Sequence, residues 1–424
     1  MRNPPLLALV ALLTGSAVSA QPIEPVEVLP TGETQPQAAA VAGALRDVAL
    51  WVTPDGGSDG LVLTAYGDFN AGLTTFGLDG TRVDLEADGP SYAVAVHDGF
   101  PLGNDTVTLV LSALEGGVVA YRLAEQGADR VQRIGPVTFD PATTFGGQQS
   151  LALYRDPGSG RFHLFKAGIR YIEQFELSGQ GGAVSATRVR IVDTGTTSPT
   201  ISGLVVDEQS GRLFAMLVGE GLWRYGIAPD AGSEGKQVAW QGDGGRLGST
   251  LGRLALYRAG TTAEGYLLAA DPARSAYNVF ERSSEVYVGS FAVVENPDEN
   301  LAGARNPLAV AVVSRTVGTD FQGGILVAHN AQGAPENLLV MPWGAVADAF
   351  DPPLRGSTGQ ADGGTNDGGT DAGAFDAGPP VSPPGKPPVS SNGGDGCSCA
   401  AASVPASALF ALLALALTGR RRRS

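Results

Sequence analysis

The stretch that decides the fold is ISGLVVDEQSGRLFAMLVGEGLWRYG, residues 201–226. Its first apolar run, residues 204–206, ends at DEQSG (residues 207–211), which has the Asp, Ser and Gly composition of a tight turn. A second apolar run covers residues 212–218, and a Gly-Glu-Gly turn separates it from the alternating LWRY of residues 222–225. These features predict three short antiparallel strands. Such a meander cannot bury its own faces and needs further copies beside it.

Five more copies of this pattern are present in the sequence, and none of them carries a sustained apolar period of 3.6 residues. Counted with the first, they make six units about 45 to 55 residues apart, which is typical of propeller blades. The other units begin with apolar strands at Leu50, Val94, Leu151, Leu254 and Leu308. The sequence therefore predicts an all-β domain over residues 45–348, a six-bladed β-propeller closed in a ring.

Composition is consistent with one large all-β domain plus appendages, since the 424 residues include 60 Gly and 43% hydrophobic residues. The formal net charge of −15 argues against a nucleic-acid partner, because binding a phosphate backbone needs a basic face. The acidity fits either a soluble exported protein or one that binds cations.

The N-terminus has the three parts of a secretory signal peptide over residues 1–20. Arg2 supplies the positive charge, residues 6–13 are apolar, and Val-Ser-Ala precedes the expected cleavage between Ala20 and Gln21. The apolar run is too short to span a membrane. Residues 21–44, rich in Pro, Glu and Ala, are expected to be a leader into the first blade.

The C-terminal part changes composition abruptly. Residues 349–395 are rich in Gly, Asp and Pro, which predicts a disordered linker, although three Asp-Gly/Ala-Gly triplets could also bind Ca²⁺ loosely. Residues 396–424 contain the chain's two cysteines, Cys397 and Cys399, then an apolar helix and a cluster of arginines. We therefore expect association with a membrane through this tail.

The last 30 residues resemble the tripartite sorting signals handled by myxosortase-type proteases. That resemblance implies a sorting protease as a partner, processing near Cys397, and attachment at the cell surface, in the outer membrane or outside the cell. A plain C-terminal membrane anchor is the alternative, and it gives nearly the same location.

The predicted propeller resembles β-propeller phytases, six-bladed calcium-dependent phosphatases that remove phosphate from inositol phosphates. The resemblance runs in order from about Arg46 to Trp343. The stretches that carry it are RDVALWV (46–52), FGLDG (76–80), DGFPLG (98–103), SLALY (150–154), IEQFELSG (172–179), LWRYGIAPDAGSEG (222–235), DGGRLGSTLGRLALY (243–257), AYNVFER (276–282), YVGSF (287–291) and VMPW (340–343).

Members of that family hold a cluster of Ca²⁺ ions with Asp and Glu at one end of the channel, and Lys and Arg there help to hold the phosphates. Carboxylates suit Ca²⁺, a hard cation that takes six to eight oxygens. In this chain Asp47 keeps the family's second aspartate, but Arg46 replaces the first. Other ligand or phosphate-binding positions of the family fall at Asn70, Ala95, Gly147, Thr200–Gly203, Leu217, Val218, Leu251–Leu254 and Asn306–Ala309.

Two functions from different classes follow. The first is a cell-surface phytase-like phosphatase that hydrolyses a phosphomonoester or inositol phosphate at a reduced site. The resemblance leaves Arg46 and Arg253 to bind substrate and Asp47 to bind Ca²⁺, and it assigns no catalytic residue. The second is a catalytically inactive propeller, a pseudoenzyme that serves as a surface binding or scaffold module, since a fold does not certify an activity.

Overall fold

The fold is taken from a computed structural model of the chain. It describes residues 24–37, 44–54, 59–127, 129–143, 150–195, 200–242, 246–260, 263–331 and 336–356. All of these lie in one compact unit, residues 1–368, and a second unit comprises residues 369–424.

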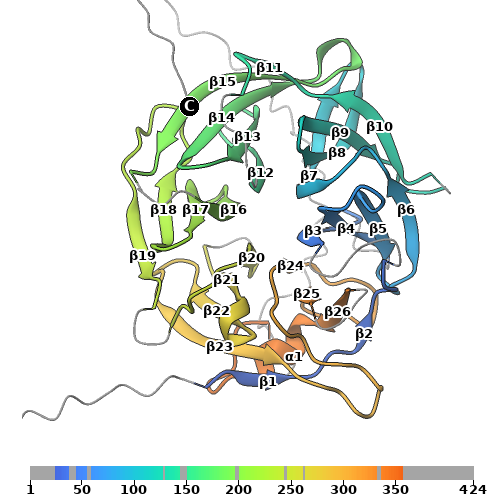
Figure 1. The fold of residues 1–424 in the computed structure, drawn as a ribbon, viewed down its shortest axis with the longest axis vertical. Helices are drawn as coiled ribbons and strands as arrows, with labels where there is room; N and C mark the ends of the chain where they lie inside the picture. Colours follow the sequence, from blue (N-terminus) through green and yellow to red (C-terminus); the bar gives the residue numbers. More distant parts are fainter. Residues whose placement is uncertain are drawn as a thin grey trace, which may run out of the picture. The chain divides into compact units, whose positions relative to one another are not determined.

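Six β-sheets form a ring in which each sheet is one blade, and this confirms the predicted all-β six-bladed propeller (Figure 1). The innermost strand of each blade contacts the innermost strands of its two neighbours, and the sixth contacts the first, so the ring is closed. From blade 1 to blade 6 the inner strands are β3 (Leu45–Val52), β7 (Ser91–Leu102), β12 (Ser150–Arg155), β16 (Ile201–Asp207), β20 (Leu254–Arg258) and β24 (Val310–Val313).

The second and third strands of each blade continue outward in antiparallel order. In blade 4 they are β17 (Arg212–Leu217) and β18 (Gly221–Gly226), so residues 201–226 do form the expected meander. The corresponding strands of the other blades are β4 (Gly60–Tyr66), β5 (Leu73–Gly77), β8 (Asp105–Leu114), β9 (Gly117–Leu123), β13 (Phe162–Ala167), β14 (Tyr171–Ser178), β21 (Gly265–Asp271), β22 (Ala276–Glu281), β25 (Ile325–Asn330) and β26 (Asn337–Pro342).

The turns of this meander follow from its turn residues. The Asp207 carboxylate accepts a hydrogen bond from the Ser210 hydroxyl at 2.6 Å, and Gly211 closes the turn with φ +67°, a conformation that glycine adopts without strain. At Gly221 a Cβ would come within 2.2 Å of the Ala239 carbonyl oxygen, so no other residue fits where β18 meets the next strand.

A fourth strand completes each blade, whereas the sequence predicted only three. These outer strands are half-exposed and rich in polar residues, so their apolar pattern is weak. They are β6 (Arg82–Glu86), β10 (Val131–Pro136), β15 (Ser185–Asp193), β19 (Lys236–Trp240) and β23 (Tyr287–Val293), and β11 (Thr138–Asp140) adds a fifth strand outside β15.

The N-terminal segment was expected to be a leader, and that prediction is wrong for residues 26–33. Strand β1 (Val26–Val28) pairs in parallel with β23 of blade 5, and β2 (Gly32–Glu33) supplies the fourth strand of blade 6. Pairing the start of the chain with its last two blades holds the ring closed. The sequence did not predict these strands, because outer strands bury little apolar surface and the segment is rich in polar residues.

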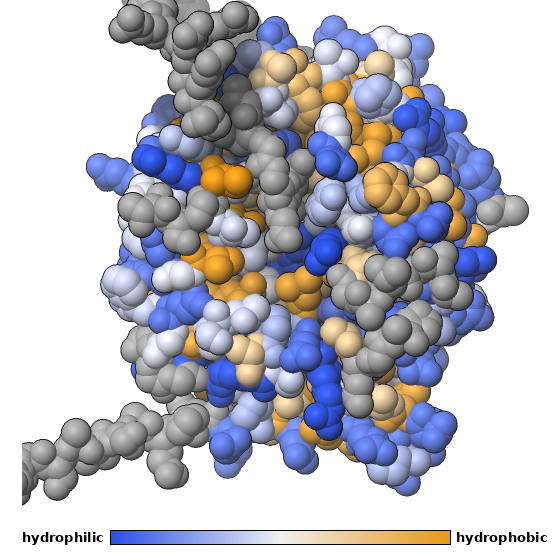
Figure 2. All heavy atoms as spheres, in the orientation of Figure 1, coloured by the Kyte–Doolittle hydropathy of each residue, from blue (hydrophilic) through white to orange (hydrophobic). Residues whose placement is uncertain are grey.

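The core lies between the blades. Six clusters of buried apolar side chains occupy the six blade interfaces, and each cluster draws on two neighbouring sheets. Between blades 4 and 5, for example, Phe214 and Met216 pack with Leu256 and Phe280. On the face drawn in Figure 2, both hydrophilic and hydrophobic residues border the centre of the ring.

The propeller also extends further toward the C-terminus than predicted. Helix α1 (Trp343–Asp348) follows β26, and Phe350 and Leu354 pack into the cluster between blades 5 and 6. The expected linker therefore cannot begin at residue 349, because these two apolar side chains are buried. Apart from α1, the helical segments among the described residues are the short turns η1 (Gln180–Gly182) and η2 (Pro272–Arg274).

The predicted signal peptide, most of the linker, and the C-terminal sorting segment lie outside the described residues, as do Ala20, Gln21, Cys397 and Cys399. Within the part of the chain that the structure describes, no helix has the length and apolar character needed to cross a membrane.

Candidate functional site

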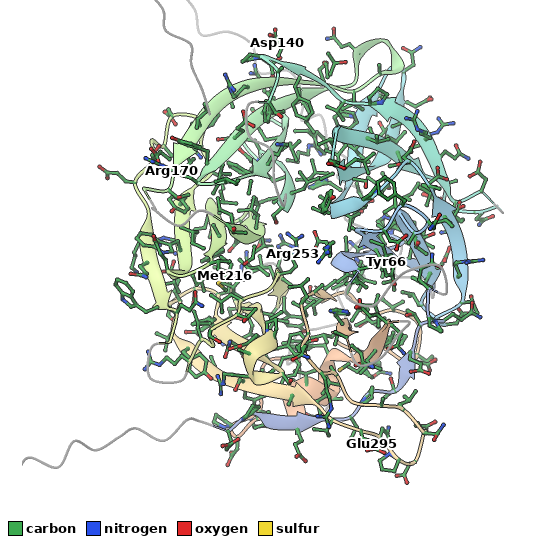
Figure 3. The ribbon with its side chains drawn as sticks, viewed as in Figure 1. Tyr66, Asp140, Arg170, Met216, Arg253 and Glu295 are labelled. Atoms are coloured by element: carbon green, nitrogen blue, oxygen red, sulfur yellow. The ribbon has the colours of Figure 1, made fainter. Side chains whose placement is uncertain are left out.

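The six inner strands begin at one end of the central channel, which we call the strand-start mouth. Arg253 directly precedes β20 of blade 5 and lies at the centre of the ring (Figure 3). Its Nε donates to the Arg46 carbonyl oxygen at 2.9 Å, and its Nη2 donates to the Tyr92 carbonyl oxygen at 2.5 Å. One guanidinium thus ties blade 5 to blades 1 and 2 at this mouth.

Asp47 lies beside this guanidinium, and its carboxylate is directed into the protein. Arg253 Nε is 3.5 Å from Asp47 Oδ1, which also accepts from the backbone N–H of Val48 at 3.0 Å. The other oxygen, Oδ2, accepts from the N–H of Val94 at 3.2 Å. Burial raises the pKa of Asp47, and the charge of Arg253 and the two N–H donors oppose that rise.

Arg46 occupies the rim of the same mouth. Its Nε atom lies so near the turn between β4 and β5 that a Cβ at Gly67 would come within 2.8 Å of it. That buried Nε has no hydrogen-bond partner among the described residues, and no described carboxylate forms an ion pair with Arg46. The half-buried guanidinium is therefore the cation at this mouth best placed to take an external anion.

The structure brings together the three residues proposed from the resemblance, Arg46, Asp47 and Arg253, at one end of the channel. Their proposed roles in binding substrate and metal stay predictions. The geometry distinguishes them, however, because Asp47 and Arg253 bond to each other and to the backbone whereas Arg46 does not.

Two buried groups of ionisable side chains near this mouth were not singled out from the sequence. In blade 3, Glu173 accepts from Arg188 at 2.9 Å, and Lys166 Nζ lies 4.0 Å from it. In blade 6, His329 Nε2 lies 3.1 Å from Glu336, which also accepts from the N–H of Leu45 in blade 1 at 3.2 Å. A charged residue flanked by apolar neighbours on a strand, as in FHLFKAG and YIEQFEL, was the available signal.

The described residues of the strand-start mouth do not fit a cluster of Ca²⁺ ions. A Ca²⁺ ion takes six to eight oxygens, whereas both oxygens of Asp47 accept backbone N–H groups and face a guanidinium that would repel a dication. Among the described residues, no group of three or more His, Cys, Asp or Glu is arranged to hold a metal ion.

The inner strands end at the opposite end of the channel, the strand-end mouth. There His97 Nε2 and Glu208 Oε1 are 2.9 Å apart, and Arg258 and Arg315 line the same cavity. The sequence analysis did not single out this group. The signal was a charged or polar residue directly after each apolar inner strand, as in AVHD, VVDE, LYR and VVSR.

Six blades of antiparallel strands closed around a central channel define this chain as a β-propeller. Comparison with known proteins identifies the family of this propeller. The family model described as Phytase matches residues 5–355, and this chain belongs to the phytase family. A 3-phytase of Bacillus subtilis (strain 168) is 24% identical over 350 residues, which are 79% of this chain and 89% of the relative.

Membership supports a phytase-like hydrolase in general terms. The family is typically calcium-dependent, and the described residues show no group of three or more metal-ligating side chains.

Proposed function

We propose that this propeller is an exported phytase-like phosphatase that acts on phosphomonoesters, inositol phosphates among them, at the strand-start mouth. The observation that carries the proposal is that the family match covers the whole propeller. The half-buried Arg46 guanidinium at this mouth adds a cation suited to a substrate phosphate, because guanidinium groups bind phosphate oxygens with paired hydrogen bonds.

In this proposal Arg46 binds the substrate phosphate. Arg253 acts as a positioning residue, because its N–H groups hold the backbone of Arg46 and Tyr92 in place. Asp47 fixes Arg253 and supplies no open oxygen to a metal. No step is assigned to Ca²⁺ and no residue is assigned as catalytic base.

A second candidate function is a binding module that recognises a phosphorylated small molecule without hydrolysing it. The inward bonding of the Asp47 carboxylate favours this candidate, because both of its oxygens accept backbone N–H groups and Asp47 is therefore not free to act as a base beside Arg46.

The two candidates are separated by assaying the full chain with phytate and with phenyl phosphate, each with Ca²⁺ and with a chelator. A phosphatase releases inorganic phosphate, and Arg46→Ala lowers kcat/KM by about tenfold, the value of one charge-assisted contact. The matched control is Arg161→Ala, an exposed arginine paired with Glu176 on blade 3. Absence of release in all four conditions, with calorimetric binding of phenyl phosphate that Arg46→Ala weakens, would leave the binding module.

Export and anchoring form the other part of the proposal. Cleavage between Ala20 and Gln21 and processing near Cys397 by a sorting protease would leave the propeller on the cell surface, with Cys399 beside the anchoring cysteine. Mass spectrometry of the protein isolated from its producing cells tests both ends. Recovery of the intact C-terminal arginine cluster from the mature protein would contradict processing and leave a plain membrane anchor.

A further inference from the structure

The strand-end mouth opens into a cavity of about 440 Å³ that all six blades line. Its walls include branched apolar side chains from five blades, namely Leu50, Val96, Leu153, Leu256 and Val312. A cavity of this size is in the range that holds a small molecule. From Arg253 to Arg258, β20 separates the two mouths by about 17 Å at 3.3 Å per residue, so the cavity is distinct from the site proposed above.

Two arginines bring positive charge to this cavity. Arg258 Nη2 donates to the Val206 carbonyl oxygen at 3.0 Å, and Arg315 Nη1 donates to the carbonyl oxygens of Val52 and Thr53 at 3.4 and 3.0 Å. Neither guanidinium forms an ion pair within 4.0 Å among the described residues. Each has five N–H groups, so most of its donors remain for water or a ligand.

The carboxylates of the same mouth are bonded to other groups. Glu208 Oε1 accepts from His97 Nε2 at 2.9 Å and from the N–H of Arg155 at 3.3 Å. Asp98 Oδ1 accepts from Trp51 Nε1 and from the Thr108 hydroxyl, both at 2.7 Å. These bonds hold both acids away from direct pairing with Arg258 and Arg315, and they rigidify the rim.

Buried charges are normally paired, and a guanidinium without a carboxylate beside an apolar cavity is suited to an incoming oxyanion. Arg258 is such a partly desolvated guanidinium. Burial lowers its pKa, and the nearby charges of Glu208 and Asp207 oppose that effect. An arginine stays protonated under these conditions. An anion in the cavity would therefore accept hydrogen bonds from Arg258 in place of the water that the guanidinium has lost on burial.

We propose that the strand-end mouth is a second binding site, which takes a small molecule carrying one oxyanion on an apolar body. The oxyanion lies between Arg258 and Arg315, and the body contacts the apolar wall. Asp98 and Glu208 limit the total charge of the ligand, so a polyphosphate such as phytate is disfavoured by repulsion. A phosphate monoester and a carboxylate both supply such an oxyanion, and the two are distinguished by titrating phenyl phosphate and benzoate separately.

The test is calorimetric titration of the full chain, in chelator, with phenyl phosphate, benzoate, inorganic phosphate and phytate. Binding of phenyl phosphate or benzoate is expected to exceed that of inorganic phosphate, because only the aromatic probes cover the apolar wall. Arg258→Met and Arg315→Met should each weaken that binding by about tenfold. Arg161→Met is the matched control that should leave it unchanged, because this exposed arginine pairs with Glu176 and does not line the cavity.

A variant at the other mouth and a local spectroscopic signal complete the test. Arg46→Met alters the strand-start mouth alone, so a loss of phenyl phosphate binding in that variant, with none in Arg258→Met or Arg315→Met, would overturn the second site. The exposed Arg315 is the variant to use if Arg258→Met does not fold. With only three histidines in the chain, the ring resonance of His97 gives a local readout, and a ligand that leaves it unshifted would also contradict the proposal.

Discussion

The two mouths of the channel place their ionic groups in opposite ways. At the strand-start mouth the Arg253 guanidinium bonds to two backbone carbonyls and lies beside a buried Asp47. At the strand-end mouth Arg258 and Arg315 bond to carbonyls alone and border an open cavity, while the carboxylates bond to other partners.

This difference shows that, in a ring of blades, the residues that stabilise the fold and the residues available for ligand binding lie in different places. The apolar clusters between the blades hold the ring together regardless of what lines the channel. Side chains at the ends of the inner strands that carry no buried pair, such as Arg315, can then be exchanged at little cost in stability. One mouth thus holds the Asp47–Arg253 ion pair, whereas Arg258 and Arg315 at the other have no carboxylate within ion-pair distance among the described residues.

The largest expected effect comes from removing residues 24–37, which should disrupt both mouths at once. The deletion removes β1 and β2 and with them the buried side chain of Val28. It also breaks backbone hydrogen bonds to blades 5, 6 and 1, such as those from Thr34 to Leu338 and from Gln35 to Gly80. At about 1 kcal/mol for each lost bond, we expect a loss of roughly 5 kcal/mol.

Thermal unfolding of the full chain and of the deleted chain measures this loss. Deletion of residues 2–20 is the matched control, since that segment precedes β1 and is expected to be removed on export. An unchanged Tm after deletion of residues 24–37 would show that the ring closes without its N-terminal strands.

The next largest effect should come from Asp47→Ala, which leaves the buried Arg253 without its carboxylate and the N–H of Val94 without an acceptor. Breaking a buried pair in this way costs about 3–5 kcal/mol. The double variant with Arg253→Met should recover most of that loss, because it removes both charges together. The corresponding change at the strand-end mouth, Arg315→Met, should cost under about 1 kcal/mol. Equal losses at the two mouths, measured by denaturant unfolding, would contradict the comparison.

The blades were predictable from the sequence because the inner three strands of each carry dense apolar runs between turn residues, as Leu204 to Tyr225 shows. Strands β6, β15 and β19 were not, since exposure on one side removes the pattern. The pairing of Val26–Val28 with β23 joins segments more than 260 residues apart, and no local signal encodes it. The meeting of Arg46, Asp47 and Arg253 followed from the resemblance, whereas the roles of Arg258 and Arg315 depend on where six separate strands end.

A smaller effect distinguishes the mouths by pH. Burial alone would lower the pKa of His97, but the hydrogen bond and charge of Glu208, with help from Asp98, raise it above 6.5. This pair therefore contributes stability that is fully present below pH 6.5 and is lost as pH rises through the folded pKa.

Glu208→Gln should reverse the sign of this dependence. Burial, the largest of the causes, then lowers the pKa of His97 against the smaller opposing contributions of Asp98 alone, so stability falls as pH drops below 6.5. Tm measured across this range for the wild type and the variant gives the difference, which cancels the effects of other groups. Glu176→Gln, which changes an exposed pair on blade 3, is the control. Parallel curves for wild type and Glu208→Gln would mean that the pair does not form in solution.

The smallest expected effect is that of calcium, and it tests the strand-start mouth directly. A ligand that binds only the folded state raises Tm according to its concentration over its Kd, so a metal site in the ring would be visible in thermal unfolding. Because the Asp47 oxygens face Arg253 and accept N–H groups, we expect millimolar Ca²⁺ and chelator to give Tm values within about 1 °C of each other. A rise of several degrees that Asp47→Ala removes would show that Arg253 yields its place to the metal. A rise that persists in Asp47→Ala would assign calcium to other carboxylates, and the mouth would keep its internal ion pair while the family's dependence on calcium was met elsewhere in the chain.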